Sequence, residues 1–86
     1  MSTLLIEYRV DDFAEWKAVF DQDPMDRGSH GVIEHRIYRD VDDDGHHLLA
    51  MNFRSPEEAT AFREALRPVW EVSGIQDAWV LPDSTE

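Results

Sequence analysis

The sequence predicts an α+β fold in which one four-stranded antiparallel sheet carries two helices on one face. Strand, helix, strand, strand, helix and strand follow one another along 86 residues, with little chain left for connections. Two strand–helix–strand halves joined by a hairpin favour one sheet of this kind. Several strands carry apolar residues on both faces, so we expect a partner to cover the face without helices. The length predicts a single domain over residues 1–86.

Alternating apolar and polar residues predict the first strand at 4–10 and the second at 32–41. One face of the first strand carries Leu4, Ile6, Tyr8 and Val10. In the second strand His35 shares a face with two isoleucines, and Val32 lies on the opposite face. We expect the face that carries His35 to be the one that the helices cover.

An N-cap and an aromatic stripe predict the first helix. Asp12 is a residue type that caps helices. The stripe that follows it consists of Phe13, Trp16 and Phe20. Spacings of three and four place these rings on one side of a helix, where we expect them to be buried. The helix should end before Pro24, and residues 24–31, which include two glycines, should form a loop.

The Asp-Gly pair within residues 42–45 predicts a tight hairpin turn. The third strand follows at 47–54, and its apolar residues on both faces are typical of a central strand. The acidic turn resembles the start of a calcium-binding loop, but Met51 occupies the position that needs a glutamate. The adjacent His46 and His47 should point to opposite faces of the sheet. We therefore predict no metal site, and one histidine with an aspartate remains an open alternative.

A cap at Ser55 predicts the start of the second helix. Its buried stripe is predicted to contain Ala59, Phe62, Leu66, Val69 and Trp70. Pro68 should bend the helix or divide it, and Gly74 should end it. The last strand is predicted at 76–81 and is followed by a polar tail at 82–86.

The composition excludes several classes of partner and site. Nineteen acidic and eight basic residues give a formal net charge of -11, which argues against binding to nucleic acid or to an anionic membrane. The chain has no cysteine, which excludes disulfides and thiolate sites. No apolar run approaches the roughly 20 residues of a membrane-spanning helix. The first ten residues predict a strand and not a signal peptide, so we expect a cytoplasmic protein.

Two polar residues are the candidate catalytic groups. His35 lies among apolar neighbours, where a histidine can act as a general base or orient a carbonyl group. Asn52 lies within a strand, where asparagine is uncommon and where its amide can bind a ligand. Structural roles remain open for both. His35 can be a core histidine bonded to backbone or to Tyr8, and Asn52 can tie down a loop or a subunit interface.

The candidate binding residues are Tyr8, Trp16, Arg27, His30 and Trp70. The two tryptophans lie on the helix stripes, where they either line a cavity for a flat ligand or belong to the core. Arg27 and His30 lie in the loop that contains the two glycines. There they either bind a carboxylate or a phenolate, or they remain exposed side chains of a flexible connection.

The sheet face without helices predicts a homodimer. It combines apolar residues with charged residues that can pair across a two-fold axis. The apolar group is Leu5, Val32, Leu48 or Leu49, and Trp79 or Leu81, and the charged group is Glu7, Arg9, Glu34 and Arg36. The alternative is that these charges keep the open sheet of a monomer soluble.

The sequence resembles the dimeric α+β barrel superfamily of ferredoxin-like proteins over nearly its whole length. The residues that carry the resemblance are 12–21, Arg27, Gly31, 38–40, 55–59, Phe62 and 73–75. The chain is most similar to small stand-alone members described as cyclases. The resemblance implies a homodimer with a ligand between sheet and helices. It also implies chemistry without a cofactor, as in the cyclases, isomerases and monooxygenases that act on aromatic or polyketide-like molecules.

Two kinds of function follow from these features. In the first, the chain is an enzyme in which His35 is the base, Asn52 is the oxyanion donor, and Arg27 guards a cavity walled by tryptophans. In the second, it is a non-catalytic dimeric module that binds a small molecule or another protein. The enzyme requires an open cavity between helices and sheet, whereas the second function predicts a small or collapsed one.

Overall fold

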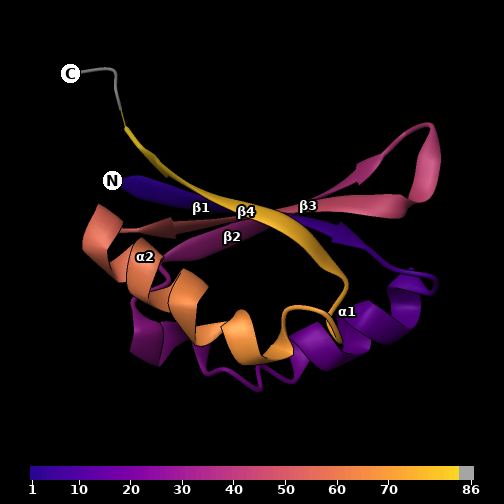
Figure 1. Cartoon of the computed structure of the whole chain (residues 1–86), viewed down its shortest axis with the longest axis horizontal. Helices are drawn as coiled ribbons and strands as arrows, with labels where there is room; N and C mark the ends of the chain where they lie inside the picture. The colour runs from indigo at the N-terminus through magenta and orange to yellow at the C-terminus, as the bar shows by residue number, and fades with distance from the viewer. Residues whose placement is uncertain (84–86) are drawn as a thin grey trace.

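The computed structural model describes residues 1–83 and confirms the ferredoxin-like α+β fold. In chain order the elements are β1 (Ser2–Arg9), α1 (Phe13–Asp21), η1 (Arg27–His30), β2 (Glu34–Asp40), β3 (Asp43–Phe53), α2 (Pro56–Ala65), η2 (Arg67–Val69) and β4 (Ile75–Pro82), where η marks a 3-10 helix. The strands form one antiparallel sheet in the order β2-β3-β1-β4, and both α-helices lie on the same side of it (Figure 1). Residues 84–86 of the predicted polar tail lie outside the described residues.

The central pair of strands, β1 and β3, carries most of the core. Leu4 of β1 lies opposite Met51 of β3, and Ile6 lies opposite Leu49. Strand alternation directs this set of side chains toward the helices. The buried apolar residues are Leu4, Ile6, Tyr8, Leu49, Met51, Phe53, Ala59, Phe62, Leu66, Ile75 and Ala78. The prediction that the third strand is central is therefore confirmed.

Helix α2 begins where its sequence predicts, but it is shorter than predicted. The side chain of Ser55 accepts a hydrogen bond of 3.2 Å from the Glu58 amide, which satisfies one of the free N–H groups of the first turn. Pro68 divides the predicted helix, because α2 ends at Ala65 and a separate 3-10 turn contains the proline. Phe62 is buried against the sheet, with its ring centroid 5.8 Å from that of Phe53. None of the described helices is long and apolar enough to span a bilayer.

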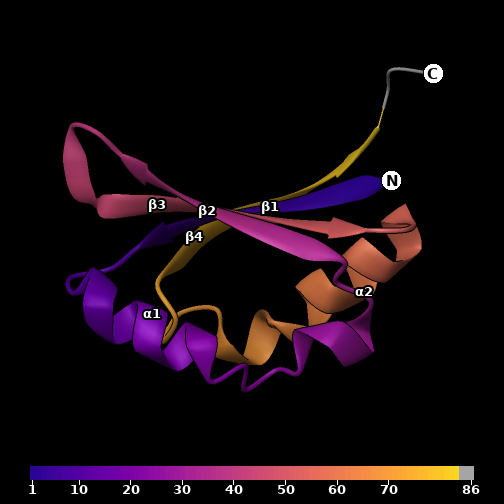
Figure 2. The ribbon, with the colours of Figure 1, turned by 180° about the vertical axis from the view of Figure 1, so that it is seen from behind.

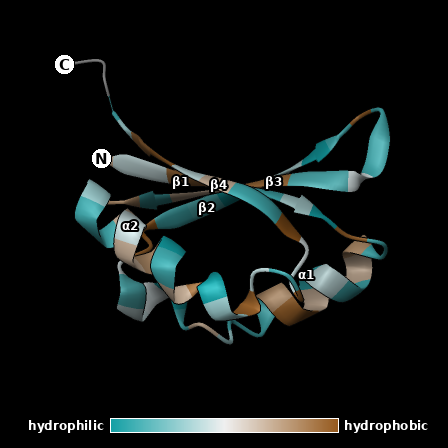
Figure 3. Cartoon of the chain, viewed as in Figure 1, coloured by the Kyte–Doolittle hydropathy of each residue, from teal (hydrophilic) through white to brown (hydrophobic). Residues whose placement is uncertain are grey.

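Helix α1 lies less deeply against the sheet than its aromatic stripe predicts. The side chain of Asp12 accepts a hydrogen bond of 3.1 Å from the Glu15 amide, so the predicted N-cap is confirmed. Phe13, Trp16 and Phe20 are only half-buried, and no residue of α1 is fully buried. Hydrophobic segments of α1 are visible in Figure 3 beneath the sheet. The reason is an open space between this helix and the sheet, described below.

The hairpin turns earlier than predicted. Its two turn residues are Val41 and Asp42, and the Asp42 amide donates to the Asp40 side chain at 2.9 Å. An aspartate that bonds the amide two residues later reverses the chain without a glycine. Gly45 therefore lies inside β3, where its carbonyl accepts a hydrogen bond of 2.9 Å from the Val10 amide. The hairpin curves away from the helical layer (Figure 2).

The sheet face without helices is partly apolar, as predicted. Leu5 and Leu48 are half-buried there, and Trp79 and Leu81 are exposed beside them. The prediction for Val32 is wrong, because this residue precedes β2 and packs against the core on the helix side. Strand alternation begins only where β2 pairs with β3, so it does not govern the residue before the strand.

Gly74 occupies the turn before β4 and does not end α2. Its φ is +78°, and its carbonyl accepts a hydrogen bond of 2.8 Å from the Arg9 amide. A Cβ at this position would lie 2.4 Å from the Arg9 carbonyl oxygen, which is backbone and cannot turn away. A glycine is therefore required where this turn meets the end of β1.

The substitution Gly74→Ala should lower the free energy of unfolding by roughly 1–3 kcal/mol, because it adds both a backbone strain and a clash. Gly28→Ala is the matched control, since no heavy atom lies within 4 Å of its Cβ position and its φ is not positive. Urea denaturation of both variants measures the difference. Equal stabilities of the two variants would contradict the requirement at Gly74.

Candidate functional site

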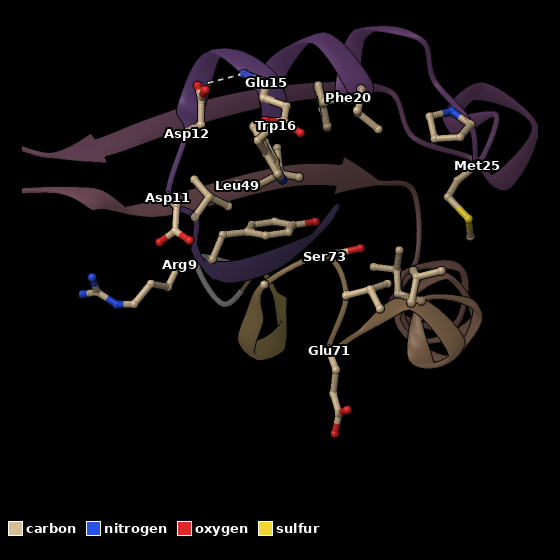
Figure 4. A pocket seen from close by; sticks show the side chains of 18 of the residues that line it. Arg9, Asp11, Asp12, Glu15, Trp16, Phe20, Met25, Leu49, Glu71 and Ser73 are labelled. Carbon is tan, nitrogen blue, oxygen red and sulfur yellow. Dashed lines mark hydrogen bonds between the residues drawn. The ribbon is translucent and has the colours of Figure 1, made fainter.

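An open cavity of about 700 Å³ lies between the sheet and the helical layer. Its walls come from β1, β3, α1, the loop after α1, and the segment from α2 to β4. The apolar lining residues are Val10, Trp16, Val19, Phe20, Pro24, Met25, Leu49, Met51, Phe62, Leu66, Val69 and Val72. In Figure 4, Trp16 lies over Leu49 inside the cavity, and the charged ends of Arg9 and Glu71 point away from it. The interior is therefore largely apolar, and the charged ends of Arg9 and Glu71 lie at its rim.

Helix α1 supplies one wall because its aromatic residues keep it away from the sheet. The ring of Trp16 meets that of Tyr8 edge to face, with centroids 5.0 Å apart, and stacks on Phe20 at 5.1 Å. These rings lie between α1 and the sheet, so α1 lies farther from the sheet than a closely packed helix would. The consequence is an aromatic-lined space, which suits a flat ligand.

Tyr8 is the polar group of the sheet inside this cavity. Its side chain is 6% exposed, and its hydroxyl forms no hydrogen bond with the described residues. Burial raises the pKa of Tyr8 to about 12, and the neighbouring Arg27 guanidinium opposes that shift. The hydroxyl is therefore protonated at neutral pH, and it is available to donate a hydrogen bond to a ligand.

Arg27 brings a fixed positive charge to the opposite wall. Its Nη1 donates to the Phe20 carbonyl at 2.8 Å and lies 3.3 Å from an Asp23 carboxylate oxygen. The guanidinium carbon lies 3.8 Å from the centroid of the Phe20 ring. The side chain is 17% exposed and so is held in one place. A guanidinium has five N–H donors, so this arrangement leaves donors for an oxygen atom of a ligand.

The structure brings together three of the predicted binding residues, Tyr8, Trp16 and Arg27, which all line the cavity. His30 and Trp70 do not line it. The exposed His30 meets the ring of Phe62 with centroids 5.1 Å apart, and Trp70 lies beneath the guanidinium of Arg67. The short helix η1 directs His30 outward, since only its first residue faces the interior.

His35 lies on the helix side of the sheet, as predicted, but it does not line the cavity. It is opposite the buried Met51, and its ring meets that of Phe20 at 5.0 Å. The side chain is exposed, because β2 is an edge strand that α1 only partly covers. Desolvation, followed by the charge of Arg27, lowers the pKa of His35. A neutral histidine thus lies outside the cavity, behind Phe20.

Asn52 lies on the opposite sheet face from His35, whereas its predicted role as the oxyanion donor of the cavity requires the helix side. Asn52 accepts a hydrogen bond of 2.8 Å from Thr3 and donates one of 2.8 Å to Glu34. It is opposite Thr3 in β1 and Glu34 in β2, all on the face without helices. Because alternate strand residues point to opposite faces, Asn52 cannot reach a ligand that contacts Tyr8. Its bonds connect three strands.

Several residues that line the cavity belong to no recognisable sequence pattern. Met25 follows α1, and Ser73 precedes Gly74 in the turn before β4. Both belong to connections whose path depends on the positive φ angles of Asp23, Asp26 and Gly74. The prediction of a loop at 24–31 was the one available indication that this segment could border a site.

A histidine held between two carboxylates lies on the opposite sheet face. His46 Nδ1 is 3.0 Å from an Asp40 oxygen, and Nε2 is 2.7 Å from a Glu7 oxygen. The bonds to Asp40 and then to Glu7 raise the pKa of His46. Within residues 1–83, no group of three or more histidine, aspartate or glutamate side chains is arranged to hold a metal ion.

Comparisons with known proteins identify the fold. The solved structure of a proposed antibiotic biosynthesis monooxygenase from Deinococcus radiodurans superposes on this chain with a TM-score of 0.56 and 16% sequence identity. The superposition covers 100% of this chain and 94% of that one. No known family profile and no curated protein matches the sequence. This chain therefore has the ferredoxin-like α+β fold of an antibiotic-biosynthesis-monooxygenase-like neighbour.

Proposed function

We propose that this chain binds a flat, largely apolar molecule that carries one hydroxyl or carbonyl oxygen, and that it acts on that molecule without a cofactor. The observation that carries the proposal is the aromatic-lined cavity with Tyr8 and Arg27 as polar groups on two of its walls. A neighbour with the same fold is described as a proposed antibiotic biosynthesis monooxygenase, which agrees with chemistry on a molecule of this kind. An aromatic or polyketide-like phenol or enol has the required shape and polarity.

The proposed chemistry depends on the charge that develops on the ligand oxygen. Loss of a proton from a phenol or an enol, to solvent or to a carboxylate at the rim, leaves an oxyanion, which the fixed guanidinium of Arg27 would stabilise. Tyr8 stays protonated because its pKa is about 12, so it would donate a hydrogen bond to the same oxygen. A ligand that fills the apolar cavity would displace water from it, which would strengthen both interactions.

A non-catalytic binding module is the second candidate, and one observation favours it. The two predicted catalytic residues, His35 and Asn52, do not line the cavity. The lining groups that can accept a proton are carboxylates, and they are exposed at the rim: Asp11, Asp12, Glu15 and Glu71. Turnover separates the two candidates, because both of them bind the ligand.

A cytoplasmic location also remains a prediction from the sequence.

Binding of 1-naphthol and of naphthalene tests the polar anchor, because the two molecules differ by one hydroxyl. We expect calorimetry to show roughly fivefold tighter binding of 1-naphthol, the value of about one hydrogen bond. Tyr8→Phe should reduce that preference without loss of stability, since the hydroxyl has no partner among the described residues. Tyr38→Phe, on the open sheet face, is the matched control. Equal affinities of the natural chain for both molecules would contradict the proposal.

Anthrone tests the chemistry. Its oxidation takes one O₂ for each molecule and yields anthraquinone and water, so no further reductant is required. Acceleration of this reaction that Tyr8→Phe weakens would support the enzyme, and binding without acceleration would support the binding module.

We also propose that two copies associate through the open sheet face. Trp79 and Leu81 are 39% and 46% exposed there, and Tyr38 is 50% exposed. Exposed aromatic and aliphatic side chains that lie together are typical of an interface. Arg9 and Glu7 at one end of the face could fix the register of the two copies.

Sedimentation of the full chain tests this association. We expect a species of twice the 10.0 kDa chain mass, and we expect Trp79→Asp to shift it to the monomer because a charge would enter the interface. Val41→Asp is the control, since Val41 is 94% exposed in the hairpin turn. A natural chain that stays monomeric at high concentration would exclude the dimer.

A further inference from the structure

His47 is a buried histidine that lacks hydrogen bonds. Its side chain is 1% exposed, and neither ring nitrogen has a hydrogen-bond partner within residues 1–83. A buried polar group without a partner destabilises the folded state. Most buried polar groups in folded proteins are paired, so an exception of this kind calls for a physical reason.

The rings of α1 lie directly on this histidine. Phe13 stacks on His47 with centroids 4.5 Å apart and planes 11° from parallel. Trp16 lies at 6.2 Å and 19°. Since His47 belongs to the central strand β3, it forms the surface on which the first half of α1 is seated.

Helix α1 has few other attachments to the sheet. Its remaining ring contacts with the sheet are those of Phe13 with the Arg39 guanidinium, of Trp16 with Tyr8, and of Phe20 with His35. No residue of α1 is fully buried, whereas α2 buries Ala59 and Phe62. Regions with little buried apolar surface open at lower free energy than the core does.

The same helix forms one wall of the cavity. Trp16, Val19 and Phe20 of α1 line it, opposite Leu49 and Met51 of the sheet. Figure 4 shows Trp16 and Phe20 extending from the helix toward the strands. Displacement of α1 from its seat would therefore widen the cavity.

The surroundings of His47 suit the neutral ring and not the cation. Desolvation, the largest effect, lowers the pKa of His47, and the charges of Arg39 and His46 act in the same direction. The Gly45 backbone and, as the smallest effect, Asp43 act in the opposite direction, although no hydrogen bond of normal geometry joins His47 to Gly45.

The elements packed on His47 offer no acceptor for a second proton. Helix α1 contributes the rings of Phe13 and Trp16, β1 contributes Tyr8, and β2 contributes the cationic Arg39, which like Tyr8 lies opposite His47. Stacking of an imidazolium on the rings would be favourable. Burial of a charge without a counter-charge costs more than such stacking gains.

We propose that α1 is a movable cover of the cavity and that His47 is its acid-sensitive seat. With a neutral imidazole, α1 stays seated on His47 and the cavity has the size described above, which is the closed state of the cover. When the ring takes a proton from solvent, α1 leaves the seat, the imidazolium becomes hydrated, and the cavity widens to its open state. A bound molecule is then retained at neutral pH and released in acid. This inference does not depend on which molecule the cavity binds.

The direction of the pH dependence follows from the two states of the ring. In the open state His47 titrates near its ordinary pKa of 6.5, and in the closed state its pKa is lower. The closed state therefore has its full stability above the open-state value. It loses stability as the pH falls from there through the closed-state value.

Amide hydrogen exchange of the full chain tests the cover. Between about pH 7.5 and pH 5 we expect the protection factors of α1 to fall by more than about threefold, because protonation of His47 removes stability from the closed state. Those of α2 should change by less than about twofold, since α2 does not touch His47. A constant protection of α1 would overturn the proposal.

Three matched substitutions assign the effect to one ring. His47→Phe keeps a stacked ring that cannot be protonated, so the pH dependence of α1 should disappear. His30→Phe, which contacts Phe62 and not α1, should retain it. If His35→Phe abolishes the effect and His47→Phe does not, the seat is His35 and the proposal is wrong.

A measurement on the natural chain covers the case in which His47→Phe does not fold. The NMR titration of the His47 ring should give a midpoint below the ordinary value of 6.5. A midpoint at or above that value would show that the seat accepts the cation, and it would overturn the proposal independently of any variant.

Discussion

The antiparallel pairing of β1 with β3 is the constraint on which the rest of the structure depends. Tyr8 lies opposite His47, and Ile6 lies opposite Leu49, so their side chains form one surface beneath the helices. A shift of one residue in this register would exchange the two faces of the sheet. The core, the floor of the cavity and the open face would then all change together. The polar anchor Tyr8 is thus fixed by the same pairing that builds the core.

The cavity results from unequal packing of the two helices on this surface. Helix α2 presents the small Ala59 and the buried Phe62, which allow it to lie close to the sheet. Helix α1 presents large rings, and its connection to β2 passes through residues with positive φ, Asp23 and Asp26. Large side chains hold a short helix at a distance, and an open space results. Arg27 borders this space because η1 starts where the connection turns back.

Local rules were sufficient to predict the fold. The caps at Asp12 and Ser55 and the break at Pro68 act within a few residues, and each appears in the structure. The hairpin turn was misplaced because an Asp-Gly pair was preferred over the side chain of Asp40, which makes the reversal instead. That choice depends on the register of β2 against β3, which changes at this aspartate. The spacing of residues within one strand carries no information on how that strand is aligned with its neighbour.

The site was predicted less completely because it depends on relations between segments. Alternation alone assigns Asn52 to the face opposite Met51. Only the pairing of β2 with β3 shows that His35 lies beside Met51, and thus on the other side of the sheet from Asn52. The residues of the cavity wall that lie in connections, such as Met25, follow from the path of the loop and not from any periodicity.

The adjacent histidines of β3 show how far the face of a strand determines chemistry. His46 points to the open face, where Asp40 and Glu7 favour the cation and raise its pKa. His47 points to the helix side, where burial favours the neutral ring and lowers its pKa. The pKa values of these two neighbouring histidines are thus shifted in opposite directions. A sequence motif of two histidines therefore has no chemical meaning until the register of its strand is known.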